Sequence, residues 1–191
     1  MNGGPWKLEE HMTYYPGNFN DGLAKGVLEV YKPNTILEFG CGVGYYCNHW
    51  ANNNVEIVHG IEPNTMNTKM FDHPNCRQIE FDITKDTNHN DILAKYDVVI
   101  SIEVAEHIQR EYHDKLFDFL VEKSKDIIIF SGARIGQPGH GHVSCRDEED
   151  WRSEFLKRGK VYDEEMTKIF RTEKSNKKNP NHCRNIQIFR N

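Results

Sequence analysis

A buried-strand pattern that runs directly into a glycine-rich turn constrains this chain more than any other feature. Residues 35–44 read Thr-Ile-Leu-Glu-Phe-Gly-Cys-Gly-Val-Gly, an apolar run with an acid followed by G-x-G-x-G. The apolar run is typical of a strand buried in a parallel sheet. Glycines allow a sharp turn and let a ligand approach the backbone. The stretch therefore predicts a strand, a turn and a helix, with a ligand site at the carboxyl end of the strand.

The acid in this stretch indicates the charge of the ligand. Glu38 lies where the strand ends, and a carboxylate there favours a cationic ligand over a pyrophosphate. The spacing of Gly40, Gly42 and Gly44 is also one residue shorter than the nicotinamide fingerprint G-x-G-x-x-G. Tyr45 stands where that fingerprint needs its third glycine. S-adenosylmethionine (SAM), which carries an amino group and a sulfonium, is therefore favoured over NAD. The alternative is a turn that binds no ligand.

Strand and helix signals alternate along the chain, which predicts an α/β fold. The expected strands are 35–39, 55–61, 78–81, 96–101, 126–130, 160–162 and 186–189, and the expected helices are 20–31, 43–51, 65–71, 106–123 and 147–158. A length of 191 residues suits one domain, 1–191, with residues 1–19 as an N-terminal lid or extension and residues 20–191 as the core.

Composition excludes several classes of protein. No run of about 18 apolar residues indicates a membrane span, and the N-terminus does not resemble a signal peptide. Five irregularly spaced cysteines without C-x-x-C suit free thiols in a reducing compartment, so we expect a cytoplasmic protein. The net charge is −5, yet residues 151–191 hold eleven Lys or Arg and five acids. This basic segment is either a solvated loop or a surface for an anionic substrate.

Two more acids follow the next two strands. Glu62, followed by Pro63, comes 18 positions after Gly44, where an acid in a nucleotide-binding fold accepts hydrogen bonds from ribose hydroxyls. Asp82 is placed to accept from the adenine amine, while Ile83 covers the ring. The alternatives are an exposed turn acid for Glu62 and a helix N-cap for Asp82.

The fourth strand ends in a segment that completes a family resemblance. Residues 97–107 read Asp-Val-Val-Ile-Ser-Ile-Glu-Val-Ala-Glu-His. Together with residues 35–44, they make the chain resemble the class I SAM-dependent methyltransferases, in the branch of small O-methyltransferases with an E-x-x-E-H segment after strand four. The resemblance covers about residues 20–190, including the last strand. It implies a Rossmann-like, seven-stranded, mostly parallel sheet flanked by helices.

The resemblance also implies roles for single residues in holding SAM. The methionyl part would be held by Glu38 and the turn residues Gly40, Cys41, Gly42 and Gly44. The ribose would be held by Glu62 with Pro63, and the adenine by Asp82 with Ile83. Ser101 and Glu103 would lie beside the sulfonium.

The E-x-x-E-H segment is a candidate metal site. If a helix starts near Glu103, then Glu103, Glu106 and His107 share one face and suit Mg²⁺ or another divalent cation. Two similar subgroups, ubiquinone-pathway O-methyltransferases and small-RNA 2′-O-methyltransferases, use such a segment with a metal, the second with one further downstream His. His140 or His142 is placed to supply it.

Two alternatives to a metal remain open for the same residues. In one, the acids simply suit a helix N-terminus and His107 is a surface residue. In the other, His107 or His142 acts as a general base without a metal, beside Glu106, because the reference pKa of histidine, ~6.5, lies near the working pH.

We therefore expect a SAM-dependent methyltransferase that acts on a hydroxyl of a small-molecule acceptor, with the catalytic residues among His107, His142 and Glu106. A metal-assisted RNA 2′-O-methyltransferase is the first alternative, and a SAM-binding protein without catalysis is the second. The expected partner is thus a small hydroxylated acceptor, with nucleic acid less favoured and no membrane. The acceptor site is expected between the N-terminal lid and the loop at residues 132–146.

Overall fold

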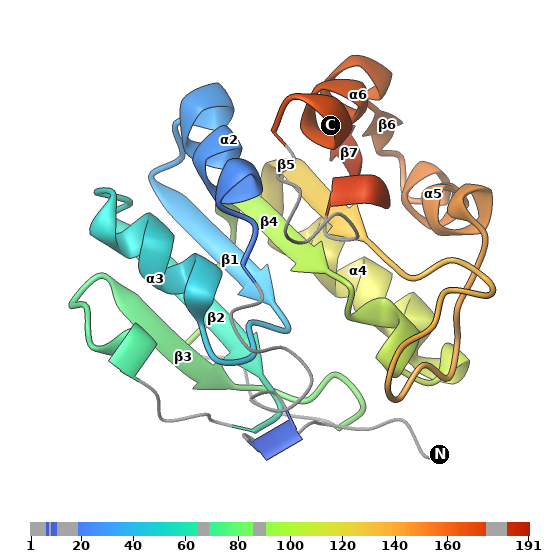
Figure 1. Ribbon diagram of the computed structural model, residues 1–191, viewed down its shortest axis with the longest axis horizontal. Helices are drawn as coiled ribbons and strands as arrows, with labels where there is room; N and C mark the ends of the chain where they lie inside the picture. Colours follow the sequence, from blue (N-terminus) through green and yellow to red (C-terminus); the bar gives the residue numbers. More distant parts are fainter. Residues whose placement is uncertain (1–6, 8, 11–18, 65–68, 86–90, 175–182) are drawn as a thin grey trace.

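A computed structural model of the chain describes residues 7, 9–10, 19–64, 69–85, 91–174 and 183–191. Within these residues seven strands form one sheet, in the order β3-β2-β1-β4-β5-β7-β6 (Figure 1). The strands are β1 (Thr35–Phe39), β2 (Ile57–Glu62), β3 (Cys76–Glu80), β4 (Tyr96–Ile102), β5 (Ser124–Ser131), β6 (Val161–Tyr162) and β7 (Gln187–Arg190).

The pairing of these strands confirms the predicted mostly parallel sheet. Strands β1 to β5 pair in parallel, while β7 pairs antiparallel with both β5 and β6. The strand order reverses at β1, which has β2 on one side and β4 on the other. A crevice opens at such a switch point beyond the carboxyl ends of the strands, and ligands of open α/β sheets bind there.

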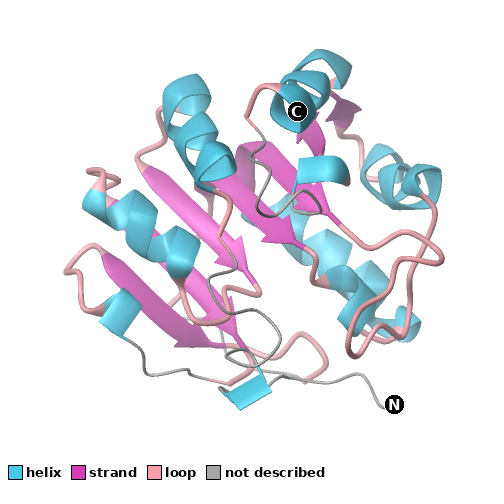
Figure 2. Cartoon of the chain, viewed as in Figure 1, coloured by secondary structure: helices cyan, strands magenta, loops and turns pink. Residues whose placement is uncertain are grey.

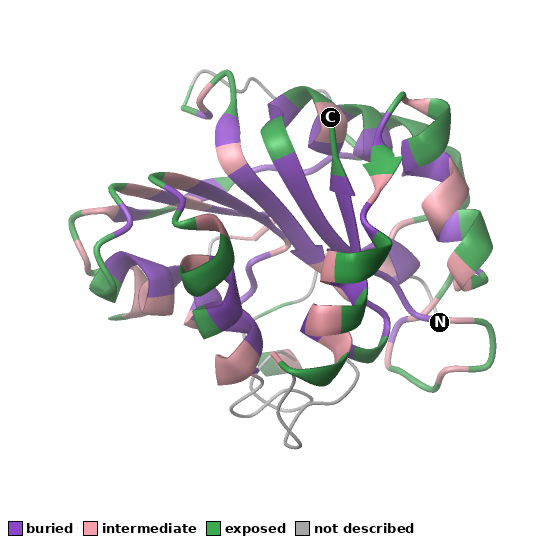
Figure 3. Ribbon diagram, turned by 90° about the horizontal axis from the view of Figure 1, so that it is seen from above, coloured by how far each residue is buried: buried purple, intermediate pink, exposed green. Residues whose placement is uncertain are grey.

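Helices cover both faces of the sheet (Figure 2). The longer ones are α2 (Asp21–Tyr31), α3 (Tyr45–Asn52), α4 (His113–Lys123), α5 (Glu148–Lys157) and α6 (Glu164–Thr172). One apolar core joins α2, α3 and α6 to the sheet through side chains such as Val27, Trp50 and Phe170. A second core joins α4 and α5 to the opposite face through Phe117 and Trp151. The central strands β1 and β4 are therefore mostly buried, whereas the edge strands β3 and β6 are partly exposed (Figure 3).

The ends of α2 explain why the helix before the first strand has these bounds. The side chain of Asn20 accepts a hydrogen bond from the backbone N–H of Leu23, at 3.0 Å, and so caps the helix. Lys32 then takes the left-handed conformation with φ of 45°, which ends the helix just before Pro33. None of the described helices is long and apolar enough to cross a bilayer.

The single helix expected over residues 106–123 is wrong. Two short 3₁₀ turns, η2 (Ala105–His107) and η3 (Arg110–Tyr112), precede α4. The chain between the two turns is extended, with ψ of 134° at Ile108. Side chains satisfy the carbonyl groups that this break frees, because Nε2 of His113 lies 3.1 Å from the carbonyl oxygens of both Ala105 and Ile108.

Other expectations differ at their ends or lie outside the described residues. Helix α6 was not expected, although Asp163 caps it by accepting from the N–H of Met166 at 3.0 Å. Of the helix expected at 65–71, the structure describes the turn η1 (Lys69–Phe71), and residues 65–68 lie outside. Most of the expected lid, and residues 175–182 of the basic segment, also lie outside the described part.

Candidate functional site

The glycine-rich turn after β1 needs its glycines for two separate reasons. Gly40, Gly42 and Gly44 all have positive φ angles, of 75°, 51° and 90°, which side chains disfavour. A Cβ on Gly40 would also lie 2.5 Å from a methyl group of Val104, and one on Gly44 would lie 2.4 Å from the ring of Phe71. The turn is thus packed closely against the segment after β4.

Two buried acids lie beside this turn. Glu38 accepts a hydrogen bond from the thiol of Cys47 at 2.9 Å, and Glu62 accepts from the N–H of Gly42 at 3.1 Å. Burial raises the pKa of Glu38 to about 8 and the pKa of Glu62 to about 7. Among the described residues no cation forms an ion pair with either carboxyl group, so this place suits a ligand with positive charge.

The third acid of the series is held differently. Burial alone would raise the pKa of Asp82, but the hydroxyl of Thr84 and the ammonium group of Lys85 lower it. Oδ1 of Asp82 accepts from the Thr84 hydroxyl at 2.7 Å, and Oδ2 lies 3.0 Å from Nζ of Lys85. Asp82 is therefore ionised, with Ile83 beside it 4% exposed.

The remaining residues expected at the cofactor are partly turned into the protein. The thiol of Cys41 packs against Gly60, whose Cβ would lie 2.7 Å from it, so the backbone of Cys41 is what the turn offers a ligand. Ser101 is fully buried, and its hydroxyl has no hydrogen-bond partner among the described residues. Pro63 is half-buried directly after β2.

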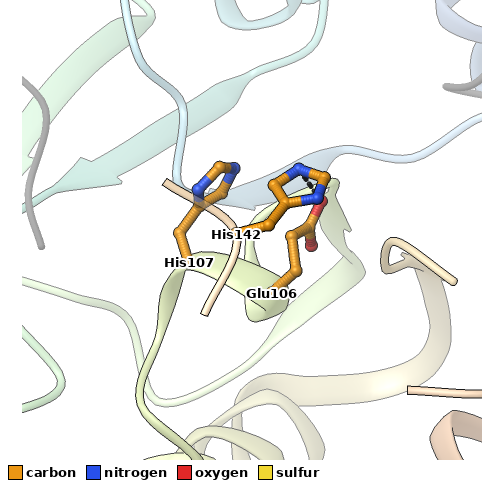
Figure 4. A group of neighbouring side chains, drawn as sticks. All are labelled: Glu106, His107 and His142. Carbon is orange, nitrogen blue, oxygen red and sulfur yellow. Dashed lines mark ion pairs between the residues drawn. The ribbon is translucent and has the colours of Figure 1, made fainter. Parts of the chain in front are cut away.

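Three of the expected metal ligands come together beyond β4. One ligand atom from each of Glu106, His107 and His142 lies within 4.8 Å of the others (Figure 4). Nε2 of His142 is 3.8 Å from Oε1 of Glu106, and the two imidazole rings are 5.0 Å apart. Glu106 is fully buried, and neither carboxylate oxygen has a hydrogen-bond partner in the described part of the chain. Burial, and next the carboxylate of Glu103, raise its pKa well above the usual range.

The loop after β5 orients His142 toward this group. Nδ1 of His142 lies 3.2 Å from the carbonyl oxygen of Gln137 and 3.4 Å from the thiol of Cys145, and Nε2 is the nitrogen that faces Glu106. The backbone N–H groups of Val143 and Ser144 both donate to the carbonyl of Glu106, at 2.9 and 3.1 Å. The ring also packs on Gly139, where a Cβ would lie 2.0 Å from Nε2.

Glu103 does not join this group, and the shared helix face expected for it does not form. It follows β4 with a φ of 53°, a strained value for a residue with a side chain. Its carboxylate accepts from the side-chain amide of Gln137 at 2.6 Å and from that of Asn185 at 3.1 Å. Sequence reasoning missed both amides, since Gln137 lies in a glycine-rich loop and Asn185 just before the last strand, without a motif.

The two candidate histidines of the loop separate clearly. His142 reaches Glu106, whereas Nε2 of His140 lies 3.8 Å from Oε1 of Glu10 in the N-terminal segment. Of the predicted lid, residues 1–19, the structure describes residues 7, 9, 10 and 19, and the ring of Phe19 packs against that of Tyr46 with 5.1 Å between centroids.

Solved structures with a similar fold are numerous and distant in sequence. A 1,6-didemethyltoxoflavin-N1-methyltransferase from Burkholderia thailandensis, with its substrate and S-adenosylhomocysteine (SAH) bound, is 10% identical over 96% of this chain and 86% of its own, with a TM-score of 0.64. A magnesium protoporphyrin IX methyltransferase from Synechocystis PCC 6803, with SAM bound, is 17% identical over 89% and 75%, with a TM-score of 0.58. The methyltransferase domain of bacterial CtHen1-CN is 15% identical over 89% and 96%, with a TM-score of 0.58.

These likenesses show the fold, and two of the three proteins hold SAM or its product, the cofactor that the sequence predicts for this chain. None of the curated proteins gives a significant match. The family model described as a methyltransferase domain matches residues 11–130, which include the glycine turn, the acids after β1 to β3 and the Glu106–His107 pair. The chain therefore belongs to this family of methyltransferase domains.

Proposed function

We propose that this protein is a SAM-dependent O-methyltransferase of a small hydroxylated acceptor, and that Glu106, His107 and His142 bind a divalent cation next to the methyl donor. The observation that carries the proposal is the convergence of these three side chains beside the glycine turn. Val104 links the two places, because it packs against Gly40 and lies two residues before Glu106.

The residues around the turn fit a ligand with positive charge. Glu38 and Glu62 are buried acids, and burial raises the pKa of both carboxyl groups. The amino group and sulfonium of SAM would lower both pKa values. Glu62 and Asp82, at successive strand ends, would accept from the ribose hydroxyls and the adenine amine. SAM supplies a methyl group already activated by its sulfonium, so the protein must mainly align the acceptor in line with it.

The three metal ligands fit a cation by the chemistry of their donor atoms. The two buried carboxylate oxygens of Glu106 have no hydrogen-bond partner among the described residues, and Nε2 of His142 lies 3.8 Å from Oε1. Nδ1 of the same ring lies 3.2 Å from a backbone carbonyl oxygen, the arrangement that commonly orients a metal-binding imidazole. Two imidazoles with one carboxylate favour Mn²⁺ or a similar ion over Mg²⁺. A bound cation would lower the pKa of the acceptor hydroxyl.

The first test is calorimetric titration with SAH, followed by titration with Mn²⁺ and with Mg²⁺ after treatment with EDTA. We expect micromolar SAH binding, and Mn²⁺ binding that is lost in Glu106→Gln while SAH binding remains. Methyl transfer to a panel of hydroxylated acceptors, with and without Mn²⁺, then tests the reaction. Absence of SAH binding by folded protein contradicts the whole proposal. SAH binding without transfer to any acceptor favours a SAM-binding protein without catalysis.

A second candidate function is metal-assisted 2′-O-methylation of an RNA end. The position of His142 favours it, because the similar RNA enzymes add one downstream His to their E-x-x-E-H segment, and His142 completes such a group here. RNA binding that weakens steeply with rising salt would support this function. Binding of a hydroxylated small molecule that added RNA does not weaken would support the first function.

A further inference from the structure

Three arginines from three different elements meet on one glutamate at the edge of the sheet. Arg134 follows β5, Arg152 lies on α5 and Arg171 lies on α6. Their guanidinium nitrogens are 2.6, 3.1 and 2.9 Å, respectively, from the carboxylate oxygens of Glu148. We name these four residues the arginine cluster. Burial would raise the pKa of Glu148, but the three arginines lower it.

The arginine cluster carries more positive than negative charge. Arg152 has a second acidic partner, Glu149, whose side chain is 78% exposed and therefore contributes little. The other hydrogen bonds of Arg134 and Arg171 go to backbone carbonyls, of Arg184 and Ile186, at 3.2 and 2.7 Å. Among the described residues, the ion pairs of the three guanidinium groups go to two carboxylates, Glu148 and Glu149, so three positive charges meet two negative ones.

The arginine cluster lies on the same side of the sheet as the proposed methyl-transfer site. Arg134 comes three residues after the carboxyl end of β5, and β7 runs antiparallel to β5, so the start of β7 lies at that end too. Asn185 donates to Glu103 at 3.1 Å, and the next residue, Ile186, accepts from Arg171. The N–H of Arg134 also lies 3.5 Å from the side-chain oxygen of Gln137. The cage around Glu103 therefore borders the arginine cluster.

The guanidinium groups are both ordered and open to a ligand. Their side chains are 35%, 22% and 24% exposed for Arg134, Arg152 and Arg171. The guanidinium of Arg152 is fixed by stacking 4.0 Å above the ring of Tyr162. The Nε atoms of Arg134 and Arg152 are buried and have no hydrogen-bond partner among the described residues, so the exposed part of each guanidinium group is its terminal nitrogens.

We propose that Arg134, Arg152 and Arg171 bind a phosphate group carried by the small acceptor, and so hold its hydroxyl toward the methyl donor. The inference rests on the proposed function and adds the substrate class, a phosphorylated hydroxy compound. Arginine forks match phosphate oxygens two at a time, and three forks suit a group with three terminal oxygens better than a carboxylate. The compact, half-buried cluster suits a single phosphate rather than the extended backbone of a nucleic acid.

The test is titration with inorganic phosphate at constant ionic strength, with acetate in parallel. We expect phosphate to bind the natural protein, and Arg171→Gln to weaken it by about tenfold, the loss of one charged hydrogen-bonding partner. Glu148→Gln removes the competing carboxylate and is expected to strengthen phosphate binding several-fold. The matched control Arg77→Gln, on β3 at the far end of the sheet, should leave it unchanged. Acetate should bind at least about fivefold more weakly than phosphate.

Phosphate affinity is expected to rise in Glu148→Gln and to fall in Arg171→Gln. A merely structural cluster gives no gain in binding, so the rise in Glu148→Gln is decisive even if Arg171→Gln fails to fold. Equal phosphate binding in both variants, or no phosphate binding at all, overturns the inference. Tight binding of single-stranded RNA that Arg171→Gln abolishes also overturns it in favour of a polyanion. SAH is titrated into each variant, so loss of the arginine site with SAH binding intact is distinguished from failure of the proposed function.

Discussion

The two ends of the crevice are built in opposite ways. At the cofactor end, Glu38, Glu62 and Asp82 lie on or just after three successive strands, and each is near its own strand in the sequence. At the acceptor end, Glu106 meets His142 from a loop 36 positions later, and Glu103 meets Asn185 from a segment 82 positions later. Short sequence motifs therefore indicate the residues of the first end, whereas those of the second end come together only through tertiary contacts.

The electrostatics of the two ends also differ. At the cofactor end, Glu38 and Glu62 are buried without an ion-pair partner among the described residues, whereas in the arginine cluster three guanidinium groups pair with two acids. Glu106 with His107 and His142 differs from both regions, since one carboxylate and two imidazoles can bind one divalent ion. If the proposed function and the proposed phosphate site hold, this arrangement would bind a cationic methyl donor and an anionic acceptor at separate ends of the site.

The largest effect is expected from Gly40→Ala, which disturbs both ends at once. The new Cβ would lie 2.5 Å from Val104 in a backbone with a φ of 75°. We expect the free energy of unfolding to fall by about 2–4 kcal/mol, from left-handed strain and overpacking together. Denaturant unfolding and SAH titration measure the two losses. The control is Gly159→Ala, with a φ of 77° and nothing within 4 Å of its Cβ, where strain alone should cost about 1 kcal/mol.

Glu106→Gln is expected to separate the two ends. Glutamine copies the shape of the protonated acid, so folding and SAH binding should be kept, while Mn²⁺ affinity falls by at least about tenfold. Calorimetry of Mn²⁺ and SAH on the same sample measures both. Glu103→Gln is the matched comparison, because Glu103 is hydrogen-bonded to Gln137 and Asn185 rather than part of the cluster. A larger loss of Mn²⁺ binding in Glu103→Gln would contradict the assignment of ligands.

Gly139→Ala tests whether the loop after β5 presents His142 to the cluster. A Cβ there would lie 2.0 Å from Nε2 of His142, so the ring must turn away. We expect a several-fold loss of Mn²⁺ affinity with unchanged SAH binding, measured by the same titrations. Gly136→Ala is the control for backbone strain in the same loop, because its φ is 83° and nothing lies within 4 Å of its Cβ. An unchanged Mn²⁺ affinity in Gly139→Ala would show that His142 is not a ligand.

The smallest effect is the pH dependence of the cofactor end. In the folded protein the pKa values of Glu38 and Glu62 are about 8 and about 7, above the ordinary value of 4.5. Between pH 4.5 and these values, the folded protein without ligand therefore binds more protons than the unfolded chain. The free energy of unfolding should therefore fall as pH rises from about 5 to 8. SAM affinity should rise over pH 6–8, by up to about tenfold for each proton released per pH unit. Titrations at several pH values, repeated with Glu62→Gln, measure the slope, and a flat profile would contradict it.

The contrast between the two ends also marks how far the sequence could be read. Thr35–Gly44 and the acids after β2 and β3 led to the sheet and the crevice, because each strand end places its own acid. Residues 106–123 were expected as one helix, since periodicity does not reveal that His113 satisfies the carbonyl groups of a break. The amides of Gln137 and Asn185 could not be found from sequence, because their meeting at Glu103 depends on where β7 enters the sheet. Asp163 with Met166 and Phe170 did carry a signal for α6 that went unused.

The place of β7 has a consequence for the order in which the molecule is completed during synthesis. Although it follows both neighbours in the chain, β7 lies between β5 and β6, and β6 pairs with β7 alone among the described strands. On the ribosome, strands β1 to β5 can pair as they emerge, because parallel neighbours are already present. The partner of Glu103, Asn185, emerges just before β7. A nascent chain can therefore pair β1 to β5 first, and the contact between Glu103 and Asn185 forms only when β7 inserts between β5 and β6.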